Sequence, residues 1–287
     1  MLIDLQLHST YSDGYLTPSV LADMISNQGI RAASLTDHNT VAGLDEFTRE
    51  CKKLNIKSIP GLELYVKHGT KKFNLLWYNY DPTEPDLHKL LRATQIRRRS
   101  SVRMFLKKLN KFGFNIDIEK ILDKHNHYIP LNHVIDEVFS STVNRFKARK
   151  EIGPHAREED IISHYFYNKN IGRLLESYVR IENIIKLRKK IGGQLIINHP
   201  GKFGHFNMDM IKKLKKLGID GLEVLSPHHS IGAVMFFQFV VNELKMISTG
   251  GSDFHKTELK KQLVKKSWDY FKIESKLLSG VEKIIKF

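Results

Sequence analysis

Apolar and polar positions alternate along the first eighty residues in a pattern that predicts strands and helices in turn. Short apolar runs predict strands, and the amphipathic stretches between them predict helices. The expected strands are residues 2–8, 30–36, 56–66 and 73–80, and the expected helices are residues 18–28 and 40–54. Thr17 and Pro18 are typical of a helix start, and Thr40 is expected to cap the second helix. This alternation indicates βα units, and hence a parallel sheet or a barrel.

The pattern changes in the middle of the chain and then returns. Helices are expected at residues 86–112, 131–139 and 181–190, with no convincing strand before residue 194. Further on, strands are expected at residues 194–198, 221–225 and 246–249, and helices at residues 208–217 and 232–243. We therefore expect one barrel-like α/β domain, residues 1–86 and 191–287, interrupted by a helical insert at residues 87–190.

Composition excludes several classes of protein. Hydrophobic residues make up 41% and charged residues 27% of the 287 positions, which is enough for a large core and excludes global disorder. No run approaches the eighteen apolar residues of a membrane span, and no secretory signal is visible. Cys51 is the single cysteine, so an internal disulfide and a cysteine-based zinc site are excluded. A reducing cytoplasm is the expected compartment.

The positive charge is concentrated in the expected insert. The chain carries a formal net charge of +15, from 46 basic and 31 acidic residues. Residues 89–190 alone hold 23 of the basic and 11 of the acidic side chains. Such a segment favours a polyanionic partner, for example a nucleic acid or a phosphorylated ligand. A solvated, lysine-rich helical surface is the alternative interpretation.

Polar residues recur where the predicted strands end. In a β/α barrel the carboxyl ends of the strands form the active face, so these side chains are expected to converge. At or after the strand ends these are His8, Asp13, Asp37, His38, His199, Asp253 and His255, and within the strands they are Glu63, Asn74 and Glu223. Imidazole and carboxylate groups are ligands of zinc, manganese and iron, and a cluster of this size suggests more than one ion. A lone histidine after a strand is more often a loop or capping residue, and Asp37 is expected to support His38 rather than bind metal.

Five short motifs resemble one known family. They are Asp-Leu-Gln-Leu-His-Ser-Thr-Tyr-Ser-Asp-Gly (4–14), Thr-Asp-His (36–38), Gly-Leu-Glu (61–63), Asn-His-Pro-Gly (198–201) and Gly-Gly-Ser-Asp-Phe-His (250–255). The chain thereby resembles the polymerase and histidinol phosphatase (PHP) family of metal-dependent phosphoesterases. This resemblance implies a distorted (β/α)7 barrel that holds one to three divalent ions, manganese, zinc or iron. Residues 130–133, 191–202 and 221–229 are most similar to a branch with a helical insert that acts on nucleoside bisphosphates and RNA 5′ ends.

The resemblance also implies a set of site residues. The implied metal ligands are His8, Asp13, His38, Glu63, His199, Asp253 and His255. The sequence departs from the family pattern at Gln6 and Asn74, where the family has histidines. Gln and Asn can each offer a carbonyl oxygen, which is a harder and weaker ligand than imidazole, so two of the three ion positions could be weakened, altered in preference or empty.

The expected function is hydrolysis of phosphate esters of nucleotides or short oligonucleotides, RNA or DNA, through a metal-bound hydroxide. His229 and His133 are candidate catalytic groups, and Lys202, Arg99 and Arg103 are candidate contacts to substrate phosphate. We expect no membrane association and no obligate protein partner. Two alternatives stay open: a phosphatase for a small non-nucleotide phosphate monoester, and a catalytically impaired barrel that binds RNA or protein.

Overall fold

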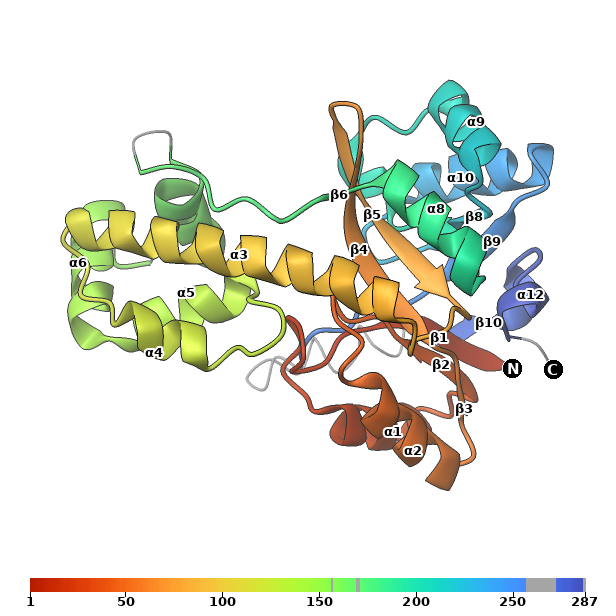
Figure 1. Ribbon diagram of the computed structural model, residues 1–287, viewed down its shortest axis with the longest axis horizontal. Helices are drawn as coiled ribbons and strands as arrows, with labels where there is room; N and C mark the ends of the chain where they lie inside the picture. The colour runs from red at the N-terminus through yellow and green to blue at the C-terminus, as the bar shows by residue number, and fades with distance from the viewer. Residues whose placement is uncertain (156, 169–170, 257–271, 286–287) are drawn as a thin grey trace. The chain divides into compact units, whose positions relative to one another are not determined.

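The chain divides into two compact units. The computed structural model describes residues 1–155, 157–168, 171–256 and 272–285 (Figure 1). One unit, here the barrel unit, comprises Met1–Leu90 and Tyr178–Phe287, and the other, here the inserted unit, comprises Leu91–Ser177. The expected assignment of residues 87–190 to a functional insert stays a prediction.

The first half of the barrel unit alternates strands and helices as expected. Its elements are β1 (Leu2–Leu7), α1 (Pro18–Asn27), β2 (Ala32–Leu35), α2 (Leu44–Lys53), β3 (Lys57–Ser58), β4 (Gly61–His68) and β5 (Lys71–Tyr78). Thr17 caps α1, because its side chain accepts a hydrogen bond from the Val20 backbone N–H. The expectation that Thr40 caps the second helix is wrong. Thr40 instead accepts a hydrogen bond from the Ala42 N–H in a local turn, and α2 begins only at Leu44.

The second half of the barrel unit resumes this alternation. After α3 (Pro85–Lys111), which runs from one unit into the other, its elements are β6 (Val179–Arg180), α8 (Ile181–Ile191), β7 (Gln194–Ile197), a 3₁₀ turn (Pro200–Phe203), α9 (Met208–Leu217), β8 (Gly221–Leu225), α10 (Ile231–Glu243), β9 (Ile247–Gly250), β10 (Ile273–Glu274), a 3₁₀ turn (Ser275–Leu277) and α12 (Glu282–Ile285). The predicted strands and helices of this region are therefore present, with ends shifted by one or two residues.

Within the described residues the strands form two sheets, ordered β10-β1-β2-β3 and β6-β4-β5-β7-β8-β9. Two isolated bridges join these sheets, one between His38 and Glu63 and one between Leu7 and Phe254. The described strands β1, β2, β4, β5, β7, β8 and β9 thus follow one another around a distorted barrel, as the resemblance implied.

One strand of this barrel runs against the expected direction. A parallel arrangement was expected, but β5 is antiparallel to both β4 and β7. β4 ends at His68 and β5 begins at Lys71, so the connection between them is a tight turn in which Gly69 adopts a φ of +58°. Parallel neighbours require a crossover of a dozen residues or more, and the short turn therefore dictates a hairpin, visible in Figure 1.

The two faces of β1 explain how the barrel presents polar groups. Ile3 and Leu5 are buried in an apolar cluster with side chains of β2, β5, β7 and β9. Asp4, Gln6 and His8 alternate with them and are also buried, with 1% of Asp4 and none of the other two side chains exposed. The strand is therefore covered on both faces, and one of the covered faces is polar.

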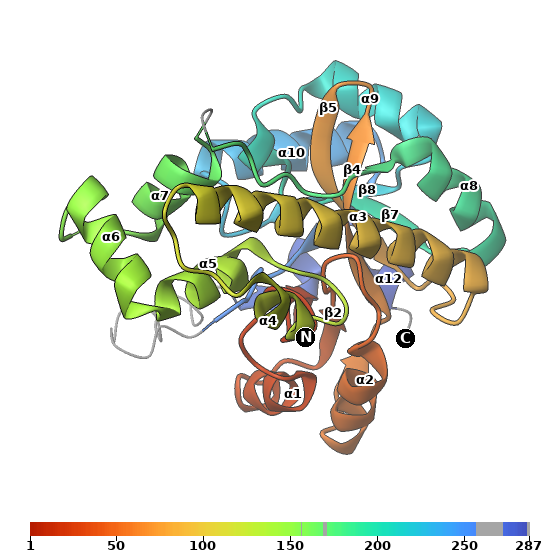
Figure 2. The same cartoon turned by 60° about the vertical axis from the view of Figure 1, so that its left-hand side comes forward.

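The inserted unit is helical and has a core of its own. It contains the second part of α3 together with α4 (Ile118–Asp123), α5 (Leu131–Ser140), α6 (Thr142–Ile152), α7 (Glu158–Ile161) and a π-helical turn (Ile162–Phe166), as Figure 2 shows. Apolar side chains of α3, among them Val102, Leu106 and Leu109, pack on α4 and α5. No helix among the described residues is both long and apolar enough to cross a membrane.

A buried arginine joins the loops of the inserted unit. Arg98 is fully buried, its Nε donates to the Ile129 carbonyl at 2.8 Å, and its Nη1 donates to the Leu175 carbonyl at 3.0 Å. The same Nη1 lies 3.0 Å from a carboxylate oxygen of Glu176. Of the three consecutive arginines Arg97, Arg98 and Arg99, Arg98 therefore has a structural role and adds no charge to the surface.

Candidate metal centre

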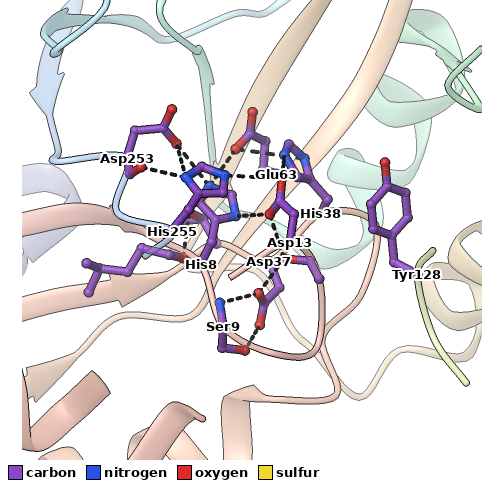
Figure 3. Close-up of polar contacts among 12 residues, drawn as sticks. His8, Ser9, Asp13, Asp37, His38, Glu63, Tyr128, Asp253 and His255 are labelled. Carbon is purple, nitrogen blue, oxygen red and sulfur yellow. Dashed lines mark hydrogen bonds and ion pairs between the residues drawn. The ribbon is translucent and has the colours of Figure 1, made fainter. Parts of the chain in front are cut away.

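The structure brings six of the predicted metal ligands together, namely His8, Asp13, His38, Glu63, Asp253 and His255 (Figure 3). Each ligand lies at or just beyond the end of a strand, except Glu63, which lies within β4. His8 and Asp13 follow β1, His38 follows β2, and Asp253 and His255 follow β9. The segment after β9 reaches β1 because Gly251 has no side chain: a Cβ there would lie 2.5 Å from the Cβ of Gln6.

Three imidazoles surround the Asp13 carboxylate. Nδ1 of His8 lies 3.3 Å from Oδ1 of Asp13, and Nε2 of His38 lies 3.3 Å from Oδ2. Nε2 of His255 lies 3.1 Å from the same Oδ2. The four ligand atoms lie within 4.8 Å of one another, and the His8 and His255 rings are stacked with centroids 4.3 Å apart. This set, the first ligand group, matches the ligand number of a tetrahedral ion.

A second ligand group shares His8 with the first. Nε2 of His8 lies 3.1 Å from Oε2 of Glu63 and 3.1 Å from Oδ1 of Asp253, and these three atoms also lie within 4.8 Å of one another. His199 approaches the same carboxylate from the end of β7, with its Nε2 3.6 Å from Oε1 of Glu63. The expected ligands of all three implied ion positions are therefore neighbours.

Gln6 and Asn74, where the sequence departs from the family pattern, also face this group. Nε2 of Gln6 donates to Oδ1 of Asp253 at 2.7 Å and to Oε2 of Glu63 at 3.4 Å. Nδ2 of Asn74 donates to Oε1 of Glu63 at 2.5 Å. Both amides thus occupy positions where a histidine would approach the same carboxylates.

Charge coupling sets the protonation of the cluster. Burial favours the neutral form of the carboxyls of Asp13, Glu63 and Asp253, but the surrounding histidines outweigh it and hold the pKa of each well below its usual value. Burial lowers the pKa of His8, yet the carboxylates around it raise that pKa well above its ordinary value. The arrangement therefore pairs anionic carboxylates with cationic charge, which a divalent ion also supplies.

The residues present fit a divalent ion. His8 is completely buried, and neither of its ring nitrogens makes a hydrogen bond of good geometry to any described residue, although both face carboxylate oxygens at 3.1–3.3 Å. Nδ1 of His199 is likewise buried, with no hydrogen-bond partner in the part of the chain that the structure describes. Imidazole and carboxylate together suit zinc, manganese and iron.

Two carboxyls support the ligands from behind. Asp37 accepts hydrogen bonds from the Ser9 N–H at 2.8 Å and from the hydroxyls of Ser9 and Ser12, both at 2.6 Å. It therefore holds the loop that runs from His8 to Asp13. Oε2 of Glu223 accepts a hydrogen bond from the His199 N–H at 3.1 Å, and burial, with the charges of Asp253 and Glu63, raises the pKa of Glu223 well above its usual value.

Two ligand candidates have a positive φ angle, a backbone conformation that residues other than glycine rarely adopt. His199 has a φ of 26° and Asp253 a φ of 51°. A non-glycine residue in this region is uncommon, and each such backbone costs on the order of 1–3 kcal/mol. Both strained conformations occur where the chain turns sharply, and each turn directs the side chain into the cluster.

His228 belongs to the site although it was absent from the predicted set. Its Nε2 lies 2.6 Å from Oδ2 of Asp253, and its ring centroid lies 5.1 Å from that of His199. A signal for it was available, since His228 follows β8 just as the other histidines follow their strands.

Both ring nitrogens of His229, a predicted catalytic group, make hydrogen bonds to backbone groups. Nδ1 lies 2.9 Å from the Val224 carbonyl, and Nε2 accepts a hydrogen bond from the Gly201 N–H at 3.1 Å. Burial lowers its pKa, which favours the neutral ring that these two bonds need. Lys202, in the adjacent 3₁₀ turn, is exposed. The functional roles of His229 and Lys202 stay predictions.

The remaining predicted residues lie in the inserted unit. His133 is on α5, with its ring centroid 5.6 Å from that of His125. Arg99 and Arg103 share the face of α3 that contacts α4. Nη1 of Arg99 donates to the Leu122 carbonyl at 2.7 Å, and Arg103 makes two hydrogen bonds to Glu119, at 2.9 and 2.7 Å. Their contacts with substrate also stay predictions.

Several characterised proteins are similar to this chain along most of its length. The phosphoribosyl 1,2-cyclic phosphate 1,2-diphosphodiesterase of Eggerthella lenta is 24% identical over 259 residues, covering 89% of this chain and 94% of that protein. A 5′-3′ exoribonuclease of Haemophilus influenzae is 26% identical, with 88% and 89% covered. The 3′,5′-nucleoside bisphosphate phosphatase of Chromobacterium violaceum is 25% identical, with 88% and 87% covered.

Solved structures share the fold. An amidohydrolase from Chromobacterium violaceum superposes with a TM-score of 0.71 at 23% identity, covering 88% of this chain and 87% of the other. A Bifidobacterium adolescentis protein assigned to the metal-dependent phosphoesterases gives a TM-score of 0.74 at 18% identity, with 95% and 97% covered. The resemblance seen in the motifs is confirmed, because residues 4–195 match the PHP domain, and the chain belongs to the PHP domain family.

Proposed function

We propose that this chain is a metal-dependent phosphoesterase that hydrolyses phosphate esters of nucleotides or short oligonucleotides. The observation that carries the proposal is the convergence of His8, His38 and His255 on Asp13, directly beside Glu63 and Asp253. The expectation of a hydrolase agrees with the relatives, which are a phosphodiesterase, a phosphatase and a ribonuclease.

The residues of the centre have separable tasks. A divalent ion held by the first ligand group supplies Lewis acidity and positive charge for a phosphate ester. Asp37 fixes the loop that carries Asp13, so the ligand is in place before substrate arrives. Lys202, in the turn after His199, and His228, beside Asp253, would offer donors to phosphate oxygens.

Proton transfer to the leaving oxygen is assigned to a histidine. His229 and His133 are the candidates from the sequence. The bonds of His229 to the Val224 carbonyl and the Gly201 N–H must rearrange before its ring can donate a proton to substrate. The single variants His133→Ala and His229→Ala test which of the two histidines donates the proton.

Two observations support a nucleotide substrate. The names of the relatives specify a ribosyl cyclic phosphate, a nucleoside bisphosphate and RNA, which share a phosphate ester on ribose. The residues of the inserted unit and its flanks, 89–190, hold half of the 46 basic side chains, which suits a substrate with more than one phosphate.

The test is phosphate release from a 3′,5′-bisphosphonucleoside, with manganese, zinc and iron supplied in separate assays. We expect release with at least one ion, and a loss of at least about 100-fold in the His255→Ala variant, because that variant lacks one of three imidazoles on Asp13. His68→Ala is the matched control, since His68 lies at the far end of β4 and pairs with Glu182. Release that persists in His255→Ala would overturn the proposed site.

The impaired barrel that binds RNA without turnover is the second candidate, and the Gln6 and Asn74 amides are the observation that favours it. Absence of release from the bisphosphonucleoside and from a 5′-phosphorylated oligonucleotide, together with retained binding of the latter, would establish it. Competition by a small phosphate monoester such as histidinol phosphate would instead indicate a non-nucleotide substrate.

A further inference from the structure

We infer that the metal centre binds a single divalent ion, on His8, Asp13, His38 and His255, and that the amides of Gln6 and Asn74 stabilise Glu63 and Asp253 where a second ion would otherwise bind. This inference rests on the proposed function, since it specifies the metal content of the same centre.

The geometry of His8 carries the first step. Its Nδ1 faces Asp13 in the first ligand group, and its Nε2 faces Glu63 and Asp253 in the second. A neutral imidazole has one lone pair for a metal and one N–H for donation. An ion bound at Nδ1 therefore leaves Nε2 as a donor to the two carboxylates, which is the common arrangement of a carboxylate behind a metal-bound histidine. If one ion bound to each ring nitrogen at the same time, His8 would have to lose both of its ring protons.

The surroundings of the two carboxylates carry the second step. Each of their four oxygens has a nitrogen close by. Oε1 of Glu63 accepts from Asn74 at 2.5 Å, and Oε2 accepts from Gln6 at 3.4 Å. Oδ1 of Asp253 accepts from Gln6 at 2.7 Å, and Oδ2 lies 2.6 Å from Nε2 of His228. The carboxylate oxygens of Glu63 and Asp253 are thus satisfied by nitrogen donors without a second ion beside them.

The chemistry of the donors decides which group holds the ion. The first group offers three imidazoles and one carboxylate, which is a complete tetrahedral set. The second group offers one imidazole, that of His8, which it shares with the first. The amides of Gln6 and Asn74 present N–H groups to its carboxylates at 2.7 and 2.5 Å, while the ring nitrogen of His228 is engaged with Asp253 at 2.6 Å. A single ion therefore gains more from the first group.

The experiment counts ions without substrate. The full chain is stripped with a chelator, loaded with excess Mn²⁺, passed through gel filtration, and analysed for manganese per chain by elemental mass spectrometry. We expect about one ion per chain and the six-line electron paramagnetic resonance signal of an isolated Mn²⁺. The double variant Gln6→His/Asn74→His restores two imidazoles beside Glu63, and we expect it to gain a second ion and to lose part of the six-line signal through coupling between neighbouring ions.

Controls separate this result from misfolding and from failure of the proposed function. Asn27→His, at the exposed end of α1, adds an imidazole outside the centre and should leave the count at about one. Circular dichroism and the thermal midpoint establish that each variant is folded. Two or more ions in the wild-type chain, or less than half an ion, would overturn the inference, and so would a folded double variant that stays at one. An unchanged count of one without any phosphate release would instead overturn the proposed function alone.

Discussion

Oδ2 of Asp13 lies 3.1 Å from Nε2 of His255, which joins the loop after β1 to the segment after β9. The same oxygen lies 3.3 Å from Nε2 of His38, so one carboxylate organises ligands from three places in the sequence. A substitution that removes the charge of Asp13 but keeps the shape of its side chain should therefore move the three histidines of the first ligand group apart.

We expect Asp13→Asn to lower the affinity for the divalent ion by at least about 100-fold and to reduce kcat/KM for a bisphosphonucleoside by a similar factor, because the variant removes the only anionic ligand of the first group. Metal titration and steady-state kinetics measure the two effects. Asp23→Asn, an exposed position on α1, is the matched control and should behave as the wild type. Unchanged metal affinity in Asp13→Asn would show that the ion binds elsewhere.

Asp37 should act through the loop that it holds. Asp37→Ala leaves the Ser9 N–H and the hydroxyls of Ser9 and Ser12 without their acceptor, and we expect it to cost on the order of 1–3 kcal/mol of unfolding free energy. Metal affinity should fall by about 10- to 100-fold, because the loop also carries Asp13.

Ser12→Ala removes only one of these hydrogen bonds and should have a smaller effect on both quantities. Urea unfolding and metal titration of the two variants test the order. Equal metal affinity in Asp37→Ala and the wild type would contradict a positioning role for Asp37.

Arg103 offers a clean test of the predicted contact between α3 and nucleic acid. It pairs with Glu119 in the structure, and both side chains are exposed, so the pair contributes little to stability. We expect Arg103→Glu to raise KM for an oligonucleotide at least about fivefold more than KM for a bisphosphonucleoside, because the longer substrate has more phosphates for a basic side chain to contact.

The charge-swapped variant Arg103→Glu/Glu119→Arg restores the ion pair with its direction reversed. If Arg103 contacts phosphate, the swap leaves KM for the oligonucleotide raised. Recovery of the wild-type KM in the swapped variant would assign Arg103 a structural role only.

His125 should make the chain sensitive to acid. Burial, with a smaller effect of His133, lowers the pKa of His125 to about 4, whereas an unfolded chain has a histidine pKa of about 6.5. Between these values the unfolded state binds more protons, so stability is full above pH 6.5 and is lost as the pH falls towards 4. We expect a loss on the order of 1–2 kcal/mol over this range from this residue.

His125→Gln removes the titrating group and should flatten this part of the stability curve. Urea unfolding of both proteins between pH 4 and 7, with a chelator present so that metal binding does not contribute, measures the difference. Parallel curves for the two proteins would rule out His125 as a source of the acid sensitivity.

The hydrophobic pattern and a few motifs of the sequence were enough to predict the family and the α/β barrel, and they named the side chains that the structure brings together as candidate ligands. Local interactions explain this success: β1 and β2 end where their apolar runs end, so the positions of His8 and His38 follow from the strands themselves. The N-terminus of α1 could also be predicted from the sequence, because Thr17 and Pro18 act within one helical turn.

Tertiary structure alone decided the features that depend on contacts between distant segments. The sequence pattern does not encode that Gln6 donates to Asp253, that Asp37 holds the loop of Ser9 and Ser12, or that His228 meets Asp253. The left-handed backbones of His199 and Asp253 are equally invisible, since they are stabilised by packing around them and not by local preference. The sequence by itself therefore determined which groups are candidates for the metal centre. The packing of the strands into a barrel determined which atoms face one another, because hydrogen bonds between side chains are specified only when strands far apart in the chain are brought together.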